Sequence, residues 1–212
     1  MLLNPLIGIP FIIVSILHII FLRKNNQLGR NITKPLLMPL LLLFYIWNVD
    51  KFNSLIIWAL IASFFGDVFL IWSEQKLFLL GGIASFLIGH IFYVFAFLSF
   101  HYPLWFYLLL VPYIVIGAVI STKLFPSINK SMKLPVGMYM VVILLMSFFS
   151  LTRIWSESFI PFLLPFLGSL FFITSDSILA FDMFTEKKRT THTSIMVTYI
   201  LAQFLIVLGF MV

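Results

Sequence analysis

The sequence predicts an all-α integral membrane protein: a bundle of eight transmembrane helices that forms a single polytopic membrane domain, residues 1–212. Hydrophobic residues make up 62% of the chain and charged residues only 9%, with a mean hydropathy of +1.15. A soluble domain is about 45–50% apolar and roughly a quarter charged. Because so few charges could not cover a water-exposed surface, the outer solvent must be hydrocarbon. The length suits one compact bundle without an extramembrane domain.

Eight apolar segments follow one another along the chain, and most are close to the length of a spanning helix, about 20 residues. They cover residues 2–22, 34–48, 54–73, 77–99, 103–122, 134–152, 159–183 and 193–212. The second segment is short and contains Pro35 and Pro39, which a span tolerates when neighbouring groups satisfy the freed carbonyls. No Lys or Arg precedes the first segment and no small-residue cleavage site follows it, so we expect it to stay in the mature protein.

The positive charges predict the orientation, because Lys and Arg accumulate in cytoplasmic loops. With the N-terminus outside, the outer loops hold only Lys51 and Arg153. The inner loops then hold Arg23, Lys24, Arg30, Lys34, Lys76, Lys123, Lys130, Lys133, Lys187, Lys188 and Arg189. We therefore expect both termini outside. The net charge of +6 is a topology signal aided by anionic membrane lipids, and we expect no nucleic-acid partner.

Tyrosine and tryptophan residues gather near the predicted span ends, as an interfacial aromatic belt requires. These residues are Tyr45, Trp47, Tyr102, Trp105 and Trp155. Most of the 26 phenylalanines are expected to face lipid or to pack between helices.

One internal resemblance divides the chain into two halves. Residues 64–70 read Phe-Phe-Gly-Asp-Val-Phe-Leu and residues 171–179 read Phe-Phe-Ile-Thr-Ser-Asp-Ser-Ile-Leu. Asp67 and Asp176 are 109 residues apart, and the same offset relates His90 to Tyr199. Four spans in each half would form two parallel repeats about an axis along the membrane normal. The offset aligns the first and fifth spans poorly, so the repeat is a hypothesis.

The two aspartates are the main candidates for function, because an ionisable group in a span costs several kcal/mol. Asp67 lies six residues and Asp176 seven residues from the predicted inner ends of the third and seventh spans. At 1.5 Å per residue, both are about 10 Å above the cytoplasmic boundary. Two parallel helices with carboxyls at one depth can bring them face to face, and neither span has Lys or Arg at that level.

Two interpretations of this pair remain open. Each carboxyl could simply be protonated and hydrogen-bonded, for instance to Ser63, Ser175 or Tyr199. A close pair in a dry site could instead share one proton and titrate as a unit. One protonated and one ionised carboxyl are a general acid beside a general base.

Other polar side chains in the spans are candidates for substrate binding. His90 and Tyr93 share one helix face, as do Tyr199 and Gln203. A packed neutral histidine and interhelical hydrogen bonds are the alternatives for these pairs. Lys34 opens the predicted second span, where it could extend to the interface or could contact a phosphate or a carboxyl.

The remaining polar residues near the inner ends receive simpler interpretations. We expect His18 to reach the interface, and Asp182 and Glu186 to be solvated beside the basic run 187–189. The chain has no cysteine, no Gly-x-Ser-x-Gly motif, no phosphate-binding loop and no histidine pair at metal-ligand spacing. We therefore expect no metal and no cofactor.

Five motifs in order along the chain carry a family resemblance. They are Thr33-Lys34-Pro35 with Met38-Pro39-Leu40, Gly66-Asp67-Val68-Phe69-Leu70, Gly89-His90-Ile91-Phe92-Tyr93, Ser175-Asp176-Ser177, and Tyr199 with Gln203. Each motif alone is weak, but together they resemble the YhhN family, which includes the TMEM86-like lysoplasmalogenases. The resemblance covers nearly the whole chain.

The resemblance implies an integral membrane hydrolase with Asp67 and Asp176 as its catalytic pair. Such an enzyme cleaves the vinyl ether bond of lysoplasmalogen to a fatty aldehyde and glycerophosphoethanolamine or glycerophosphocholine. Since not every bacterium makes plasmalogens, the substrate of a bacterial member could be another ether lipid or lysophospholipid. A short, cysteine-free chain fits a bacterial inner membrane, with the site nearer the cytoplasmic side.

The chemistry of a vinyl ether agrees with two carboxyls. Protonation at the β-carbon gives an oxocarbenium ion that water captures, so an acid and a carboxylate suffice, as in a glycosidase. Which aspartate is the acid stays open at this point. The candidate substrate-binding residues are Lys34, which would hold the phosphate, and His90, Tyr93, Ser175, Tyr199 and Gln203, which would orient the reacting groups.

Three other functions compete with hydrolysis. Paired aspartates could relay protons or bind a cation in a transporter. An intramembrane aspartyl protease also uses two aspartates, but a Pro-Ala-Leu-like segment is missing. In a structural or assembly protein, both aspartates would be replaceable without effect.

Overall fold

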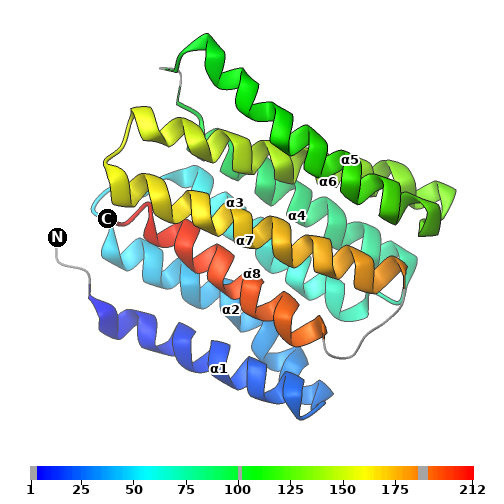
Figure 1. Ribbon diagram of the computed structural model, residues 1–212. Helices are drawn as coiled ribbons and strands as arrows, with labels where there is room; N and C mark the ends of the chain where they lie inside the picture. The colour runs from blue at the N-terminus through cyan, green and yellow to red at the C-terminus, as the bar shows by residue number, and fades with distance from the viewer. Residues whose placement is uncertain (1–3, 100–101, 186–190) are drawn as a thin grey trace.

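The computed structural model describes residues 4–99, 102–185 and 191–212, which form eight α-helices and no strand (Figure 1). The helices are α1 (Ile9–Arg23), α2 (Gln27–Asn48), α3 (Ser54–Phe69), α4 (Lys76–Phe97), α5 (Leu110–Leu124), α6 (Lys130–Ser150), α7 (Phe159–Phe184) and α8 (Thr191–Leu208). Short 3-10 turns extend them: η1 (Pro5–Gly8), η2 (Leu70–Trp72), η3 (Leu104–Leu109), η4 (Phe125–Ser127) and η5 (Leu151–Trp155). Each predicted segment contains one helix, so the all-α prediction is confirmed.

Six helical segments in the described part of the chain are long and apolar enough to cross a membrane. They are Pro5–Arg23, Ser54–Trp72, Lys76–Phe97, Leu104–Ser127, Lys130–Trp155 and Phe159–Phe184. The first turns of α2 are polar, and the apolar part of α8, His192–Leu208, is shorter. The chain is therefore a multi-pass membrane protein. That α2 and α8 also cross, and that both termini face outside, stay predictions.

The start of the second helix differs from the prediction. α2 begins at Gln27, seven residues before the predicted segment, because the Asn26 side chain caps it by accepting a hydrogen bond from the Gly29 amide (2.9 Å). Lys34, which was predicted to open the second segment, therefore lies about two turns inside a helix. Pro35, which follows it, also lies within α2.

Close approach and hydrogen bonds hold the helices together, because lipid tails give no hydrophobic drive between spans. α3 packs along α4, and α7 packs along α8. A Cβ atom at Gly89 would lie 3.2 Å from the Ala59 carbonyl oxygen, and one at Gly168 would lie 2.8 Å from that of Ala202. The pairs α3–α4 and α7–α8 are the arrangement that two four-helix repeats would need, although the repeat stays a hypothesis.

The core of the bundle lies between α2, α3, α4, α6, α7 and α8, and large buried side chains fill it. The largest include Leu37, Leu41, Ile56, Leu60, Tyr93, Phe97, Phe148 and Phe172. α1 and α5 lie at opposite edges of the bundle (Figure 1), where they expose rows of aliphatic side chains. Such rows suit contact with lipid.

The two ends of the bundle differ in charge. Both termini lie at one end (Figure 1), together with Lys51 and Arg153. The other end carries Arg23, Lys24, Arg30, Lys76, Lys123, Lys130 and Lys133. Lys187, Lys188 and Arg189, which the orientation argument also counted, lie outside the described residues.

Arg153 is a buried residue and not the loop cation that the sequence indicated. Its guanidinium donates hydrogen bonds to the carbonyls of Pro161 (3.2 Å) and Gly209 (3.2 Å) and lies 3.8 Å from the Glu157 carboxylate. It also lies 4.1 Å from the centre of the Phe210 ring. Arg153 therefore fastens the start of α7 to the end of α8.

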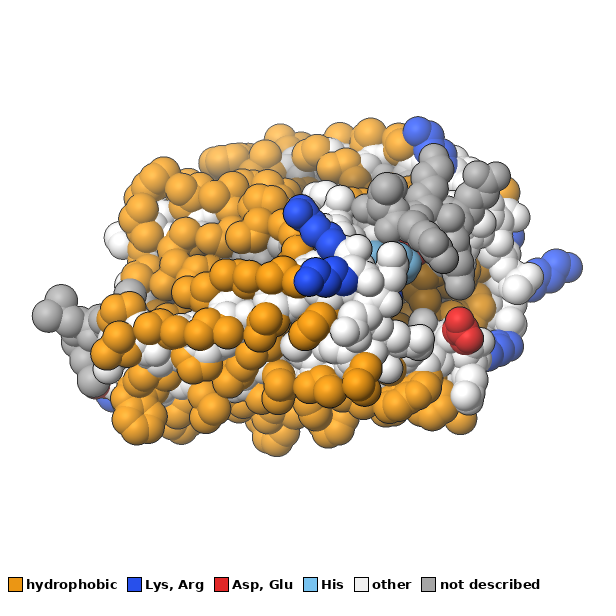
Figure 2. Space-filling model, turned by 90° about the horizontal axis from the view of Figure 1, so that it is seen from below, with side chains coloured by type: hydrophobic (Ala, Val, Ile, Leu, Met, Phe, Trp, Pro, Cys, Tyr) orange, Lys and Arg blue, Asp and Glu red, His pale blue; other side chains and the backbone are white. Residues whose placement is uncertain are grey.

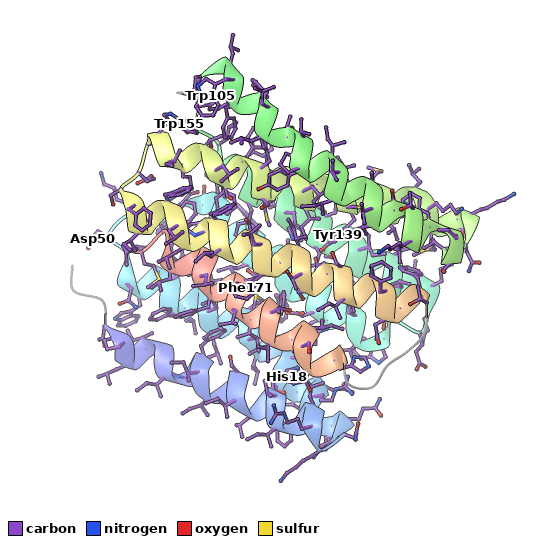
Figure 3. All side chains as sticks on the ribbon, viewed as in Figure 1. His18, Asp50, Trp105, Tyr139, Trp155 and Phe171 are labelled. Atoms are coloured by element: carbon purple, nitrogen blue, oxygen red, sulfur yellow. The ribbon has the colours of Figure 1, made fainter. Side chains whose placement is uncertain are left out.

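The aromatic residues at the span ends divide into two groups. Trp47, Trp105 and Trp155 are exposed, and Figure 3 places Trp105 and Trp155 near the end with the termini. Tyr45 is buried at 1% exposure, and its hydroxyl accepts a hydrogen bond from the Asn53 amide (2.8 Å). The prediction of an interfacial role was wrong for Tyr45, because it closes the loop before α3.

Candidate functional site

A cavity of about 750 Å³ lies near the positively charged end of the bundle. Residues from α1, α2, α3, α4, α6, α7 and α8 line it. Its polar lining includes Asp67, Asp176, Lys34, Tyr139, Tyr199, Ser175, His18 and Arg30. Figure 2 shows a largely hydrophobic face with a recess at the end where charged and histidine side chains gather. The cavity lining thus combines polar and apolar side chains.

Asp67 lies near the end of α3 and is 1% exposed. Tyr199 on α8 donates a hydrogen bond to its Oδ2 atom (2.8 Å), and the Lys34 ammonium on α2 lies 3.7 Å from Oδ1. The sequence argument found no cation in the third or seventh span, but α2 supplies one. Asp67 thus has an ammonium near one oxygen and a phenol on the other, which are the partners that a carboxylate takes.

Gly66, the residue before Asp67, helps to explain how Tyr199 on α8 comes close to Asp67. The Phe86 ring packs against Gly66, where a Cβ atom would lie 2.6 Å from the ring. The edge of the same ring meets the Tyr199 ring, at 5.9 Å between centres and 90° between planes. Gly66 therefore leaves the space for Phe86, and Phe86 supports the tyrosine that hydrogen-bonds Asp67.

Asp176 lies on α7 and is half-buried. The Tyr139 hydroxyl on α6 donates a hydrogen bond to its Oδ2 atom. Within the described ranges, no Lys or Arg forms an ion pair with this carboxyl. Asp67 and Asp176 line the same cavity. The structure therefore brings the two carboxyls into one site with different partners.

Tyr139 is a site residue that the sequence did not reveal. It stands among apolar residues of α6, where a tyrosine is ordinary. The internal repeat was the one signal available, because α6 takes the place in the second half that α2 takes in the first. Lys34 from α2 contacts Asp67, and Tyr139 from α6 contacts Asp176.

Three predicted site residues do not line the cavity. The Tyr93 hydroxyl donates to Gln203 Oε1 (2.6 Å), and Gln203 Nε2 donates to the Ser63 hydroxyl (3.0 Å). These contacts join α4, α8 and α3 in the interior. His90 Nδ1 donates to the Phe86 carbonyl (2.7 Å), and its ring edge packs against the Tyr139 ring, 5.2 Å between centres. Interhelical packing accounts for all three positions.

Ser175 lines the cavity, but its hydroxyl is engaged elsewhere. It donates a hydrogen bond to the Ile195 carbonyl (3.0 Å) and so ties α7 to α8. Of the predicted substrate-binding residues, Lys34, Ser175 and Tyr199 thus face the cavity beside the two aspartates.

Two expectations about residues near the inner ends were wrong. His18 is 1% exposed and does not reach the interface, because α2 covers it and its Nδ1 atom contacts the Thr33 hydroxyl (2.7 Å). Asp182 is not solvated, because α8 packs beside it and His192 Nε2 lies 3.8 Å from its Oδ2 atom. Glu186 lies outside the described residues. His18, Asp182 and His192 all line the cavity.

Among the residues that the structure describes, no cluster of three or more His, Asp or Glu side chains is placed to bind a metal ion. The arrangement includes the carboxyls of Asp67 and Asp176, the phenols of Tyr139 and Tyr199, and the Lys34 ammonium, all in the lining of one cavity. These groups can move a proton and bind an anion.

Comparisons with known proteins agree with this architecture. The chain is 30% identical over 204 residues to the human protein named lysoplasmalogenase TMEM86B, with 94% of this chain and 84% of that protein covered. It is also 30% identical over 159 residues to the Bos taurus protein named lysoplasmalogenase TMEM86A, with 71% and 62% covered. No solved structure matches the chain. The model of the YhhN family matches residues 29–210, so the chain belongs to the YhhN family.

Proposed function

We propose that this protein is a membrane hydrolase that cleaves the vinyl ether bond of a lysoplasmalogen. The observation that carries the proposal is the placement of Asp67 and Asp176 in one cavity with unequal partners. The names of two relatives, both lysoplasmalogenases, support the substrate class. The products are a fatty aldehyde and a glycerophospho headgroup.

The partners of the two carboxyls support a division of roles between them. Asp67 is held as a carboxylate by Lys34 and Tyr199, so it serves as the base. Asp176 has no Lys or Arg partner in the described ranges and shares the cavity with the Asp67 carboxylate, so the protonated form suits it. A protonated carboxyl beside an ionised one is the pair that acid–base chemistry needs.

The reaction then proceeds in two stages. The Asp176 proton adds to the β-carbon of the vinyl ether, which leaves an oxocarbenium ion between the ether oxygen and the α-carbon. The Asp67 carboxylate stabilises this cation and takes a proton from the water that attacks the α-carbon. The bond between the hemiacetal carbon and the glycerol oxygen then breaks: the glycerol oxygen takes the proton from Asp67, and the hemiacetal hydroxyl gives its proton to Asp176 as the aldehyde forms. One water is consumed, and both carboxyls regain their first state.

The charges of the cavity fit a phospholipid headgroup. Arg30 and Lys34 lie four residues apart on α2, so they share one face, and both line the cavity. Their positive charges suit the phosphate, while the apolar walls suit a single chain. In the predicted orientation, with eight spans and both termini outside, this end faces the cytoplasm. A bacterial inner membrane would suit such a chain.

A direct assay tests the proposal. Purified protein is incubated with a 1-alkenyl lysophospholipid, and free aldehyde is measured, with a 1-acyl lysophospholipid and a saturated 1-alkyl lysophospholipid as comparison substrates. We expect aldehyde from the alkenyl lipid alone. Release of fatty acid from the acyl lipid would instead indicate a lysophospholipase. Absence of any product, together with proton-dependent uptake in vesicles, would favour a transporter that uses the same aspartates.

A further inference from the structure

His18 is a buried polar residue in the cavity wall to which the proposed reaction gives no role. It lies on α1, is 1% exposed, and lines the cavity beside Arg30 and Lys34. Figure 3 places it on the inner side of α1, toward α8 and away from the end with the termini. A histidine in an apolar span needs partners for both ring nitrogens.

The hydrogen bonds of Thr33 fix the tautomer of His18. The Thr33 hydroxyl has one proton, which it donates to the Gly29 carbonyl (2.7 Å). Since a carbonyl can only accept, Thr33 has no proton left for His18 and must accept one from His18 Nδ1 (2.7 Å). In the neutral ring, Nε2 is then the nitrogen without a proton. The ring is buried at 1% exposure, where a charged imidazole without a carboxylate partner would be costly.

The Nε2 atom of His18 has no hydrogen-bond partner among the described residues. An unpaired buried acceptor is costly, and native proteins contain few of them. His90 Nε2 shares this property, but His90 lies outside the cavity lining and packs between aromatic rings. His18 differs because it lies where a ligand would bind.

We propose that His18 Nε2 accepts a hydrogen bond from the sn-2 hydroxyl of the lysophospholipid, and so selects lipids with one chain. This inference rests on the proposed function. In such a lipid the sn-2 carbon stands between the phosphate and the sn-1 ether. His18 lines the same cavity as Lys34 and the two aspartates, and its partner Thr33 is the residue before Lys34.

The other groups of the substrate fit this acceptor poorly. The phosphodiester and the ether oxygen have no proton to donate at neutral pH. An ethanolamine ammonium can donate, but Lys34 and Arg30 repel a cation, and choline has no N–H. In a lipid with two chains the sn-2 oxygen is acylated and donates nothing. A free sn-2 hydroxyl is therefore the neutral donor that the site can accept.

A binding experiment separates this inference from catalysis. The ligands are two saturated ether lipids that cannot be cleaved: 1-O-hexadecyl-2-hydroxy-glycero-3-phosphoethanolamine and its 2-deoxy analogue. Their dissociation constants are measured for the full-length protein in nanodiscs. We expect the hydroxy lipid to bind roughly tenfold more tightly, because the analogue leaves His18 Nε2 unpaired.

Three variants locate the effect. His18→Phe keeps a ring of similar size without the acceptor, so the preference should fall to about one. Thr33→Val removes the hydroxyl that orients the imidazole, so the preference should fall partly, and this residue does not line the cavity. His192→Phe is the matched control, since His192 lines the same cavity but is paired with Asp182, and the preference should persist.

The outcomes distinguish the two proposals. If the natural chain binds both lipids equally, or if His18→Phe keeps the preference, the role of His18 is refuted while aldehyde release can still support hydrolysis. If the preference is present but no alkenyl lipid is cleaved, hydrolysis is refuted and the hydroxyl contact stands. If neither lipid binds, both proposals are refuted. Should His18→Phe fail to fold, an unchanged preference in Thr33→Val would count against the proposal.

Discussion

The two aspartates lie in similar local sequences on α3 and α7, yet their surroundings differ. Asp67 is buried between an ammonium from α2 and a phenol from α8, whereas Asp176 is half-buried and accepts from a phenol on α6. Similar local sequences therefore give one carboxyl with a cation among its partners and one whose hydrogen-bond partner is a phenol. The difference arises on the neighbouring helices and not on the helices that carry the aspartates.

The largest expected effect comes from replacing each aspartate with asparagine. Asp67→Asn and Asp176→Asn should each lower aldehyde release by about 10²–10⁴-fold, because each removes one partner of the proton transfer. Stability should separate them. Asp67→Asn leaves the largely buried Lys34 without its counter-charge and should lower the melting temperature more than Asp176→Asn does. Equal melting temperatures would contradict the proposed asymmetry.

Replacing Lys34 tests how much the ion pair between Lys34 and Asp67 contributes to activity. Lys34→Met should lower kcat/KM roughly a hundredfold, because Asp67 loses the charge that keeps it ionised and the phosphate loses a cation. The same change at the exposed Lys24, one loop earlier, is the control and should have little effect. If both variants lose activity equally, the cause is general surface charge and not the pair with Asp67.

Replacing Tyr199 should lower kcat more than replacing Tyr139, because the proposal makes the partner of Tyr199 the charged aspartate. Tyr199→Phe removes a hydrogen bond to a charged carboxylate and should lower kcat roughly tenfold or more. Tyr139→Phe removes a hydrogen bond to Asp176, which is neutral in the proposed reaction, so kcat should fall only a few-fold. Measuring kcat for both variants sharpens the assignment of roles. The opposite ranking would exchange the acid and the base.

The smallest effect concerns the packing behind Asp67. Gly66→Ala would push the Phe86 ring toward Tyr199 and should destabilise the protein by about 1–3 kcal/mol, with a few-fold loss of activity. Gly137→Ala on α6 is the matched control, since its Cβ would meet only the Phe125 ring at an ordinary 3.4 Å. It should be neutral or slightly stabilising. Thermal unfolding of both variants checks this.

Hydropathy was enough to predict the helices, and it failed where a helix is polar. The residues from Gln27 to Thr33 carry no apolar run, so the first turns of α2 were missed. The available signal of a helix start was Asn26, a residue type common at the N-cap. That signal is weak when no apolar helix face follows it. Because of this error Lys34 was placed at a helix start, where a lysine can reach the interface, and not inside the helix.

The aspartates could be predicted because charge in an apolar span is rare, and Tyr199 and Lys34 were among the candidate partners, but Tyr139 was not. A tyrosine such as Tyr139 is common in membrane helices, so nothing in its own segment distinguishes it. His18, Asp182 and Arg153 stand near span ends, where polar residues usually meet water or headgroups. Their burial depends on which helix covers them, α2 for His18 and α8 for Asp182. That is a property of the packed bundle.

The pairing of Arg153 with Glu157 has a consequence for how the chain enters the membrane. In the predicted orientation, the loop between α6 and α7 must be translocated, and moving one elementary charge against the membrane potential costs about 2.3 kcal/mol per 100 mV. Glu157 compensates Arg153, and in the loop before α3 Asp50 stands next to Lys51. Both hairpins can therefore cross with no net charge, so their insertion should depend little on the potential.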